Sequence, residues 1–229
     1  MPSTRFDLSA LRHTGEHLLP MGDGHMQVVV NAAAHGAPRG IALIAHPHPL
    51  LGGSAKHKVP HALATALAEA GWWVLRPNFR GVGLSSGQHD HGRGELEDLD
   101  ALCLALHATQ PQAPLALLGF SFGAFVMSHL GQRLQARETP ASRTVLMGTP
   151  FGRVPAGRNY DSAPPLPQSL VIHAECDEAA PLSAALAWAR PSAHPVTVIP
   201  GADHFFTGHL NRLRALVLQH LNTCPNPCP

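Results

Sequence analysis

From residue 40 onward, short apolar segments alternate with segments that have the hydrophobic period of a helix, and this alternation restricts the fold most. Ile41-Ala42-Leu43-Ile44-Ala45 is apolar on both faces, as a strand buried inside a parallel sheet is. Strands separated by helices are typical of β-α-β crossovers. The expected strands are 41–45, 72–76, 114–119, 143–148, 170–174 and 196–199, and the expected helices are 55–70, 95–109, 122–136, 181–189 and 209–221. We therefore predict an α/β protein whose mostly parallel central sheet carries helices on both faces.

The N-terminal part predicts an antiparallel hairpin. Residues 16–21 and 25–33 are strand-like, and Gly22-Asp23-Gly24 between them is a turn sequence. The longest irregular stretch late in the chain, 149–167, is too short to form a domain. We therefore expect no cap domain.

Length and composition fit one globular unit. The chain has 229 residues, of which 45% are hydrophobic and 14% charged, and such a composition argues against disorder. We expect residues 1–229 to form a single domain, with its core at about 14–222 and a frayed tail at 223–229. Cys224 and Cys228 in that tail lack a second pair at zinc spacing, so a tail without metal or disulfide is the preferred interpretation.

The charge balance argues against several classes of partner. A formal net charge of +1 offers no electrostatic footprint for nucleic acid or for an anionic membrane surface. No apolar run approaches the roughly 18 residues that a membrane span needs, and no basic-then-apolar leader opens the chain. We expect a cytosolic protein that acts on a small molecule; its oligomeric state does not follow from the sequence.

A serine lies between an expected strand and an expected helix. Gly119-Phe120-Ser121-Phe122-Gly123 has the pattern G-x-S-x-G and joins the expected strand 114–119 to the expected helix 122–136. This pattern is typical of the nucleophile elbow, a tight turn that projects the serine hydroxyl from the sheet, with glycines that let strand and helix approach. The alternative is a packing turn in which Ser121 only caps the helix.

A serine nucleophile needs a base, and the base needs an acid that fixes its tautomer. In α/β-hydrolases the order along the chain is serine, acid, histidine. Asp177 follows the expected strand 170–174, and His204 follows the expected strand 196–199. Because ligands bind at the carboxyl ends of parallel strands, we expect Ser121, Asp177 and His204 to meet there as a catalytic triad.

Other residues compete for the same roles. Glu175 and Glu178 flank Asp177 and remain alternatives for the acid, with Glu178 able to substitute if the loop turns differently. Asp203 adjoins His204, and since neighbouring side chains diverge it is interpreted as a turn residue.

The remaining histidines have simpler interpretations than catalysis. His209 lies in the pattern of the last helix and is expected at the surface, whereas His173 alternates with apolar strand residues and is expected in the core. Four more histidines lie in two loops: His46, His48, His89 and His91. Because neither an HExxH nor an HxHxDH pattern accompanies them, we expect no metal site.

Hydrolysis of an ester also needs N–H donors for the oxyanion. The N–H of Phe122, directly after the serine, is one candidate. The second should come from the loop after the early strand, residues 46–53, whose two prolines cannot donate. His48 is then the first available donor, and Leu50 is the alternative.

Arg80 lies in the glycine-rich loop 78–87. We expect it to pair with Glu95 or Asp98 and to fix that loop; contact with a substrate carboxylate is the alternative.

Taken together, these motifs resemble those of the small, capless bacterial serine hydrolases of the α/β-hydrolase superfamily. The residues that carry the resemblance are His46-Pro47-His48-Pro49-Leu50 with Gly52-Gly53, the segment 78–87 with Gly92, Gly94-Glu95 and Asp98, and Gly119 to Gly123, Asp177 and His204. It covers about residues 14–222. The resemblance implies the α/β-hydrolase fold and an esterase-like activity on an undefined substrate.

We therefore predict a serine hydrolase that cleaves carboxylic esters or thioesters through an acyl-enzyme and needs no cofactor. A site without a cap favours short acyl chains, with Tyr160 and Phe205 as lining residues. Two alternatives remain: an amide or peptide-bond hydrolase on the same triad, and a catalytically silent hydrolase fold that serves in binding.

Overall fold

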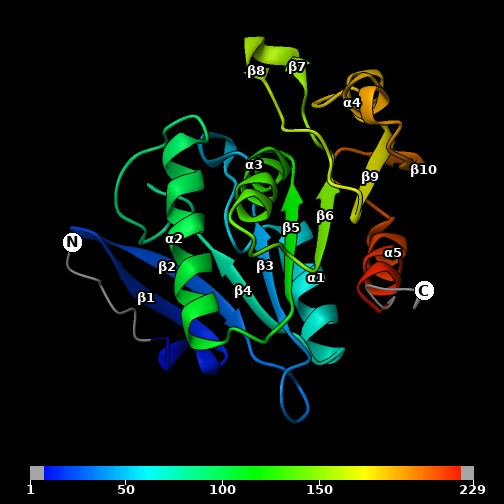
Figure 1. The fold of residues 1–229 in the computed structure, drawn as a ribbon. Coiled ribbons are helices and arrows are strands. Elements are labelled where there is room, and N and C mark those ends of the chain that lie inside the picture. The colour runs from blue at the N-terminus through cyan, green and yellow to red at the C-terminus, as the bar shows by residue number, and fades with distance from the viewer. Residues whose placement is uncertain (1–7, 223–229) are drawn as a thin grey trace.

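An eight-stranded sheet forms the centre of the computed structural model, which describes residues 8–222. The strand order is β1-β2-β4-β3-β5-β6-β9-β10. The hairpin of β1 (Gly15–Met21) and β2 (Gly24–Asn31) is antiparallel, and β2 also pairs with β4 (Trp73–Pro77) antiparallel. Every other strand pair in this sheet is parallel. The predicted mostly parallel sheet is confirmed (Figure 1).

The other elements follow the predicted alternation. The remaining strands of the sheet are β3 (Ile41–Ala45), β5 (Leu115–Phe120), β6 (Arg143–Met147), β9 (Ser169–Cys176) and β10 (Val196–Asp203). The helices are α1 (Lys58–Glu69), α2 (Arg93–Thr109), α3 (Phe122–Ala136), α4 (Leu182–Ala189) and α5 (Leu210–Asn222). Short 3-10 turns lie at Ala10–Arg12, Pro49–Leu51, Pro155–Gly157 and Arg190–Ser192.

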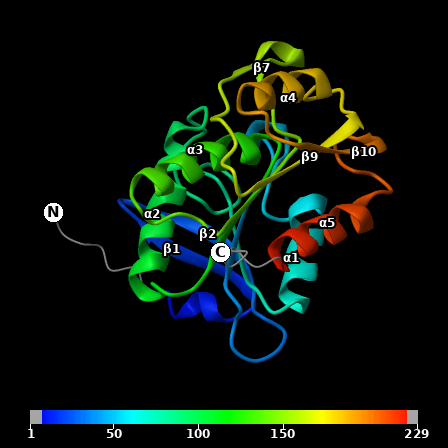
Figure 2. The same ribbon diagram turned by 45° about the vertical axis from the view of Figure 1, so that its right-hand side comes forward.

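Two hydrophobic cores lie on opposite faces of the sheet. Along β3, Leu43 packs into the core that α2 and α3 cover, whereas Ile44 packs into the core beneath α1 and α5. This alternation follows from the two-residue period of a strand, which sends successive side chains to opposite faces. Figures 1 and 2 show α2 and α3 on one side of the sheet and α1 and α5 on the other.

Several local predictions differ from the structure, and two of these differences lie beside the cavity that adjoins Ser121. The helix expected at 55–70 begins at Lys58, because residues 54–57 form a turn and the side chain of His57 accepts a hydrogen bond from the Val59 N–H (3.4 Å). The stretch 149–167, expected to be irregular, contains a small hairpin of β7 (Gly152–Arg153) and β8 (Asn159–Tyr160).

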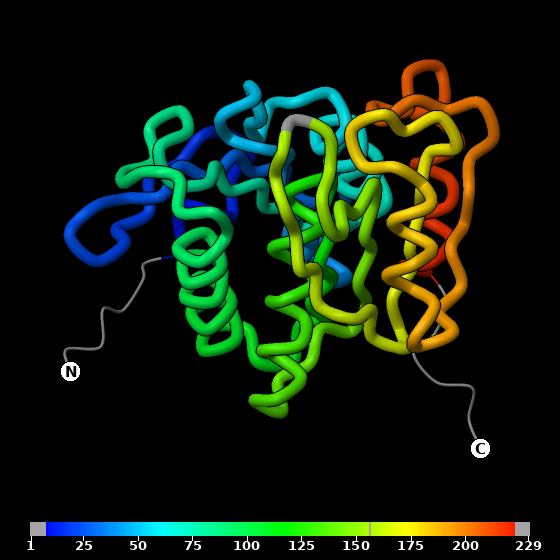
Figure 3. Tube along the Cα trace, turned by 90° about the horizontal axis from the view of Figure 1, so that it is seen from above, coloured from blue at the N-terminus to red at the C-terminus, as the bar shows by residue number. Residues whose placement is uncertain are grey.

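The β7–β8 hairpin lies at the carboxyl edge of the sheet. The arrows of β5 and β6 point toward it in Figure 1, and Figure 3 looks down onto this edge. No cap domain covers the edge within residues 8–222. In the same part of the chain, no helix has the length and apolar character needed to cross a bilayer. The predicted tail with Cys224 and Cys228 lies outside the described residues.

Candidate active site

Ser121 occupies a strained turn between β5 and α3. Its backbone has φ 55° and ψ −121°, a region that non-glycine residues rarely adopt, at a cost of about 1–3 kcal/mol. The Ser121 N–H donates to the Met147 carbonyl (2.8 Å), and its own carbonyl accepts from the N–H of Ala124 (2.8 Å). The Ser121 hydroxyl does not cap α3, so the alternative of a simple helix cap does not describe this turn.

Glycine is required on both sides of this serine. A Cβ at Gly119 would overlap the carbonyl of Gly123, and a Cβ at Gly123 would overlap the carbonyl of Ala45 at the end of β3. The two glycines therefore let α3 start directly against the strands, with Ser121 at the carboxyl edge of the sheet.

Three side chains from three strand ends form a continuous hydrogen-bonded chain. The hydroxyl of Ser121 donates to Nε2 of His204 (3.0 Å), and Nδ1–H of His204 donates to Oδ2 of Asp177 (2.7 Å). Asp177 Oδ1 accepts from the N–H groups of Ala179 (3.0 Å) and Ala180 (2.7 Å). These bonds fix the carboxylate, and the carboxylate in turn fixes the tautomer in which Nε2 of His204 accepts a proton.

Two of the three neighbouring acids, Glu175 and Asp203, bond to other groups. Glu175 is exposed and accepts from the Gly201 N–H (2.8 Å), while Asp203 accepts from the Thr207 N–H (2.8 Å) and so closes a turn, as expected. Glu178 is exposed. Within residues 8–222, none of these three carboxylates bonds to His204.

His173 lies directly behind the acid. It is fully buried, and its Nε2–H donates to the Ala180 carbonyl (2.7 Å), 3.5 Å from Asp177 Oδ2. Burial lowers its pKa, so the ring is neutral. The sequence predicted a core histidine but not its contact with the loop that holds Asp177.

The candidate oxyanion donors differ in availability. Among residues 8–222, the N–H groups of Phe122 and His48 donate to no protein acceptor. The N–H of Leu50 is already bonded to Nδ1 of His48 (3.2 Å). His48 is therefore the better placed of the two alternatives in that loop.

A cavity of about 140 Å³ adjoins Ser121. Its lining residues are Pro47, His48, Leu51, His57, Ser121, Pro150, Val154, Arg158, Tyr160, Ala179, Ala180, His204 and Phe205. Tyr160 and Phe205 thus both line the site, as predicted. No acidic residue of the described chain is among the lining residues.

Comparison with known proteins places this geometry in a family. The family model described as serine aminopeptidase, S33, matches residues 37–174, more than half of the chain. An α/β serine hydrolase without lid from Xanthomonas campestris is 31% identical, with a TM-score of 0.79 over 91% of this chain and 94% of that one. The chain is an α/β serine hydrolase of this family. The resemblance drawn from the motifs is thereby confirmed.

A second solved structure supports this assignment, and two curated proteins match part of the chain. An α/β serine hydrolase homologue from Coxiella burnetii is also 31% identical to this chain. Its TM-score is 0.76 over 91% of this chain and 98% of the Coxiella chain. An uncharacterized protein of Rickettsia prowazekii is 46% identical over 94 residues, 41% of this chain and 40% of that protein. The aligned region spans 33% of a second curated relative, from Saccharomyces cerevisiae. The hydrolase therefore matches well under two thirds of the length of these curated relatives.

A buried network supports the loop that carries His48. Nδ1–H of His46 donates to the Pro47 carbonyl (2.7 Å), and its Nε2 accepts from the Phe79 N–H (3.0 Å). Burial lowers the pKa of His46 to about 3, so this ring stays neutral and joins the two loops. In the sequence, His46 is one of the four histidines of the two loops, and no local pattern indicates this role.

Glu95 organises the second loop. Its buried carboxylate accepts from Nδ1 of His89 (2.8 Å), from the N–H of Asp90 (3.0 Å) and from the N–H of Gly92 (2.9 Å). The ring of His89 lies 4.8 Å from that of His48, centroid to centroid. The contact between His89 and Glu95 has no signal in the sequence.

These histidines do not form a metal site in the described chain. Within residues 8–222, no group of three or more side chains of His, Cys, Asp or Glu could hold an ion together.

Arg80 pairs with Asp98, which is one of the two partners expected, through two hydrogen bonds (2.8 and 2.9 Å).

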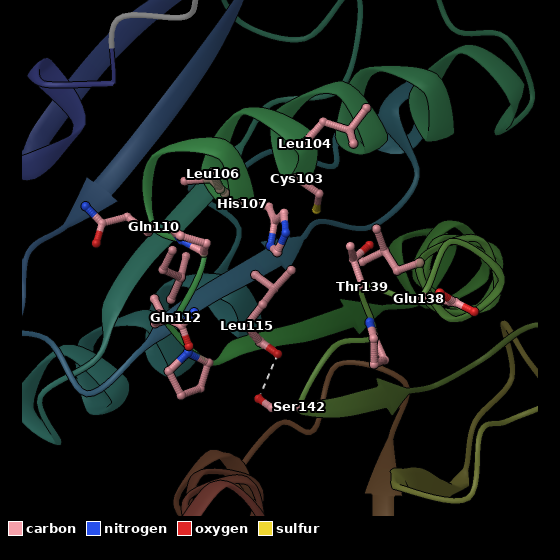
Figure 4. A pocket seen from close by; sticks show the side chains of 16 residues that line it. Cys103, Leu104, Leu106, His107, Gln110, Gln112, Leu115, Glu138, Thr139 and Ser142 are labelled. Atoms are coloured by element: carbon pink, nitrogen blue, oxygen red, sulfur yellow. Dashed lines mark hydrogen bonds between the residues drawn. The ribbon is translucent and has the colours of Figure 1, made fainter.

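A larger cavity of about 350 Å³ lies at the opposite edge of the sheet. Leu115, the first residue of β5, lines this cavity (Figure 4). Ser121 comes directly after Phe120, the last residue of β5, and so lies at the other end of the same strand. The titratable lining residues of the cavity are Cys103, His107 and Glu138. Burial raises the pKa of Cys103 to about 12, so the thiol is protonated and not nucleophilic at neutral pH.

Proposed function

We propose that this hydrolase cleaves carboxylic esters or thioesters through a covalent acyl-enzyme. The observation that carries the proposal is the unbroken hydrogen-bonded chain from Ser121 through His204 to Asp177. Geometry of this kind activates a serine hydroxyl, which is a poor nucleophile unless a base removes its proton.

Each residue has a distinct role in the proposed reaction. Ser121 Oγ attacks the acyl carbon while Nε2 of His204 takes the hydroxyl proton and then delivers it to the leaving group. Asp177 holds His204 in the required tautomer and offsets the charge of the imidazolium. Water, activated by His204 in turn, releases the acid and restores Ser121.

The N–H groups of Phe122 and His48 are the proposed oxyanion donors. Both are without a protein acceptor in residues 8–222, as donors that wait for a substrate oxygen must be. Each such donor contributes about 3–4 kcal/mol to stabilisation of the transition state. The open, small cavity favours short acyl groups.

Amide hydrolysis is the second candidate, because the matching family model is described as serine aminopeptidase. An aminopeptidase must hold the ammonium group of a peptide N-terminus, which calls for a carboxylate. No acidic residue lines the cavity in the described part of the chain, and Arg158 places a positive charge there. A cavity with a positive charge and without a carboxylate repels an ammonium group, and this favours ester cleavage over aminopeptidase activity.

A fluorophosphonate probe tests the nucleophile. We expect the wild-type protein to be labelled, Ser121→Ala to be unlabelled, and the exposed Ser183→Ala in α4 to be labelled as the wild type is. A folded wild-type protein without labelling would instead favour a silent hydrolase fold that serves in binding. Turnover of a p-nitrophenyl ester faster than of the matching p-nitroanilide supports the esterase, and the reverse order supports the amidase.

We further propose that residues 1–229 form one domain, with its core at about 14–222. The cytosolic location and the lack of a cofactor stay predictions from the sequence.

A further inference from the structure

Arg158 brings a positive charge to the cavity of Ser121. It lies between the 3-10 turn Pro155–Gly157 and β8, in the hairpin at the carboxyl edge of the sheet, and it lines the cavity together with Ser121 and His204. No motif in the sequence marks Arg158, which lies in the stretch 149–167 that is expected to be irregular.

This arginine has no acidic partner among the described residues. Arg80, by contrast, is neutralised by two hydrogen bonds to Asp98. Arg158 forms no ion pair within residues 8–222, and its buried Nε lacks a hydrogen-bond partner there. An arginine that lines a cavity without a carboxylate partner can bind an anion that enters the cavity.

The other polar groups that line the cavity do not compensate this charge. Burial lowers the pKa of His48 to about 4 and also lowers the pKa of His57, so both rings are neutral at pH 7. The positive charge of Arg158 contributes to the low pKa of His48, as expected when both face the same cavity. Among the residues that line the cavity, Arg158 therefore carries the permanent charge.

We propose that Arg158 binds the carboxylate of the substrate, so that the preferred substrates are half-esters or half-thioesters of short dicarboxylic acids. The inference rests on the proposed function: the ester carbonyl lies at Ser121 and the free carboxylate at Arg158. Hydrolysis adds water across the acyl bond and yields the dicarboxylate and the alcohol or thiol.

A carboxylate fits this site better than a larger anion does. The planar guanidinium binds a carboxylate through two parallel hydrogen bonds, and one cation balances one negative charge. A doubly charged phosphate would need further donors, and the lining residues supply no second cation. The cavity of about 140 Å³ limits the chain between the two groups to a few carbons.

A matched pair of esters tests the proposal. Mono-4-nitrophenyl glutarate and 4-nitrophenyl methyl glutarate differ only in the free carboxylate, and the rate with Ser121→Ala gives the background of each. We expect the wild-type kcat/KM to be about 10- to 100-fold higher for the charged ester, since charge-assisted hydrogen bonds are among the stronger ones. A charged-to-neutral ratio of one or less overturns the proposal.

Variants assign the preference to Arg158. We expect Arg158→Leu to bring the charged-to-neutral ratio of kcat/KM to about one, and Arg158→Lys to give an intermediate ratio because it keeps the charge but loses the planar fork. Arg153→Leu, an exposed position in β7, is the matched control and should keep the wild-type ratio. A preference that survives in Arg158→Leu overturns the assignment.

A binding measurement separates this proposal from the proposed function. Ligand-observed NMR with monomethyl glutarate in the Ser121→Ala background needs no turnover; we expect binding to Ser121→Ala, and at least tenfold weaker binding to the double variant Ser121→Ala/Arg158→Leu. Equal binding to Ser121→Ala and to Ser121→Ala/Arg158→Leu contradicts the carboxylate site even if the wild type hydrolyses neutral esters. If the wild-type protein is not labelled by the fluorophosphonate but binding still depends on Arg158, the proposed hydrolysis by Ser121 is contradicted and the carboxylate site is not.

Discussion

Nδ1 of His204 lies 2.7 Å from Oδ2 of Asp177, and this contact determines which nitrogen of the ring faces Ser121 without a proton. A carboxylate can only accept, so it requires a proton on Nδ1 and leaves Nε2 as the base. Strands β9 and β10 are neighbours in the sheet, so the segments that follow them lie close together. The contact between His204 and Asp177 joins these two segments.

Asp177→Asn should therefore remove most of the activity while the fold is kept. The side-chain amide of the variant can donate a hydrogen bond to Nδ1 of His204, which favours the tautomer with the proton on Nε2. In that tautomer Nε2 cannot accept the proton of Ser121. We expect kcat for a p-nitrophenyl ester to fall about 10⁴-fold. Glu178→Gln, at an exposed neighbouring acid, should keep the wild-type kcat. A comparable loss in both variants would show that Asp177 is not the orienting acid.

Gly123→Ala should strongly destabilise the protein. The added Cβ would overlap the carbonyl of Ala45, and backbone cannot move aside as a flexible side chain can. We expect the free energy of unfolding to fall by at least about 3 kcal/mol, measured by urea denaturation. In Gly131→Ala, on the same helix, the nearest atom is the flexible end of Leu166, so stability should change by no more than about 1 kcal/mol. Equal effects of both substitutions would contradict this account of the elbow.

The order of strands and helices could be predicted from the sequence because each depends on local periodicity. The strand β3 is apolar on both faces, and helix α3 was predicted with the bounds that the structure has, Phe122–Ala136. Ser121, Asp177 and His204 each follow a strand in the order of the α/β-hydrolases, and the sheet brings such positions to one edge.

The surroundings of the site could not be predicted in the same way. Arg158 reaches the cavity through the β7–β8 hairpin, whose position depends on packing between distant segments and has no local period. Likewise, the contact between Glu95 and His89 depends on a tight loop turn, and the start of α1 at Lys58 depends on a cap by the His57 ring. Local propensity does not specify contacts of this kind.

Glu95→Ala should destabilise the loop beside His48. The substitution removes a buried acceptor for three donors, from His89, Asp90 and Gly92, and leaves them without this partner. We expect the free energy of unfolding in urea to fall by about 3 kcal/mol or more. Glu97→Ala, two residues further along α2, removes an exposed carboxylate and should cost less than about 1 kcal/mol. Similar losses in both variants would mean that burial of Glu95 contributes little.

His46 should make the stability of the protein sensitive to acid. Burial lowers its pKa to about 3 from 6.5, so between these values the unfolded chain binds a proton that the folded one excludes. Its contribution is complete above pH 6.5 and decreases by about 1.4 kcal/mol per pH unit below it. In urea denaturation from pH 7.5 to 5, His46→Gln should therefore be less stable at pH 7.5 but lose stability less steeply, whereas the exposed His35→Gln should keep the wild-type slope. Parallel slopes for His46→Gln and wild type would contradict a neutral, buried His46.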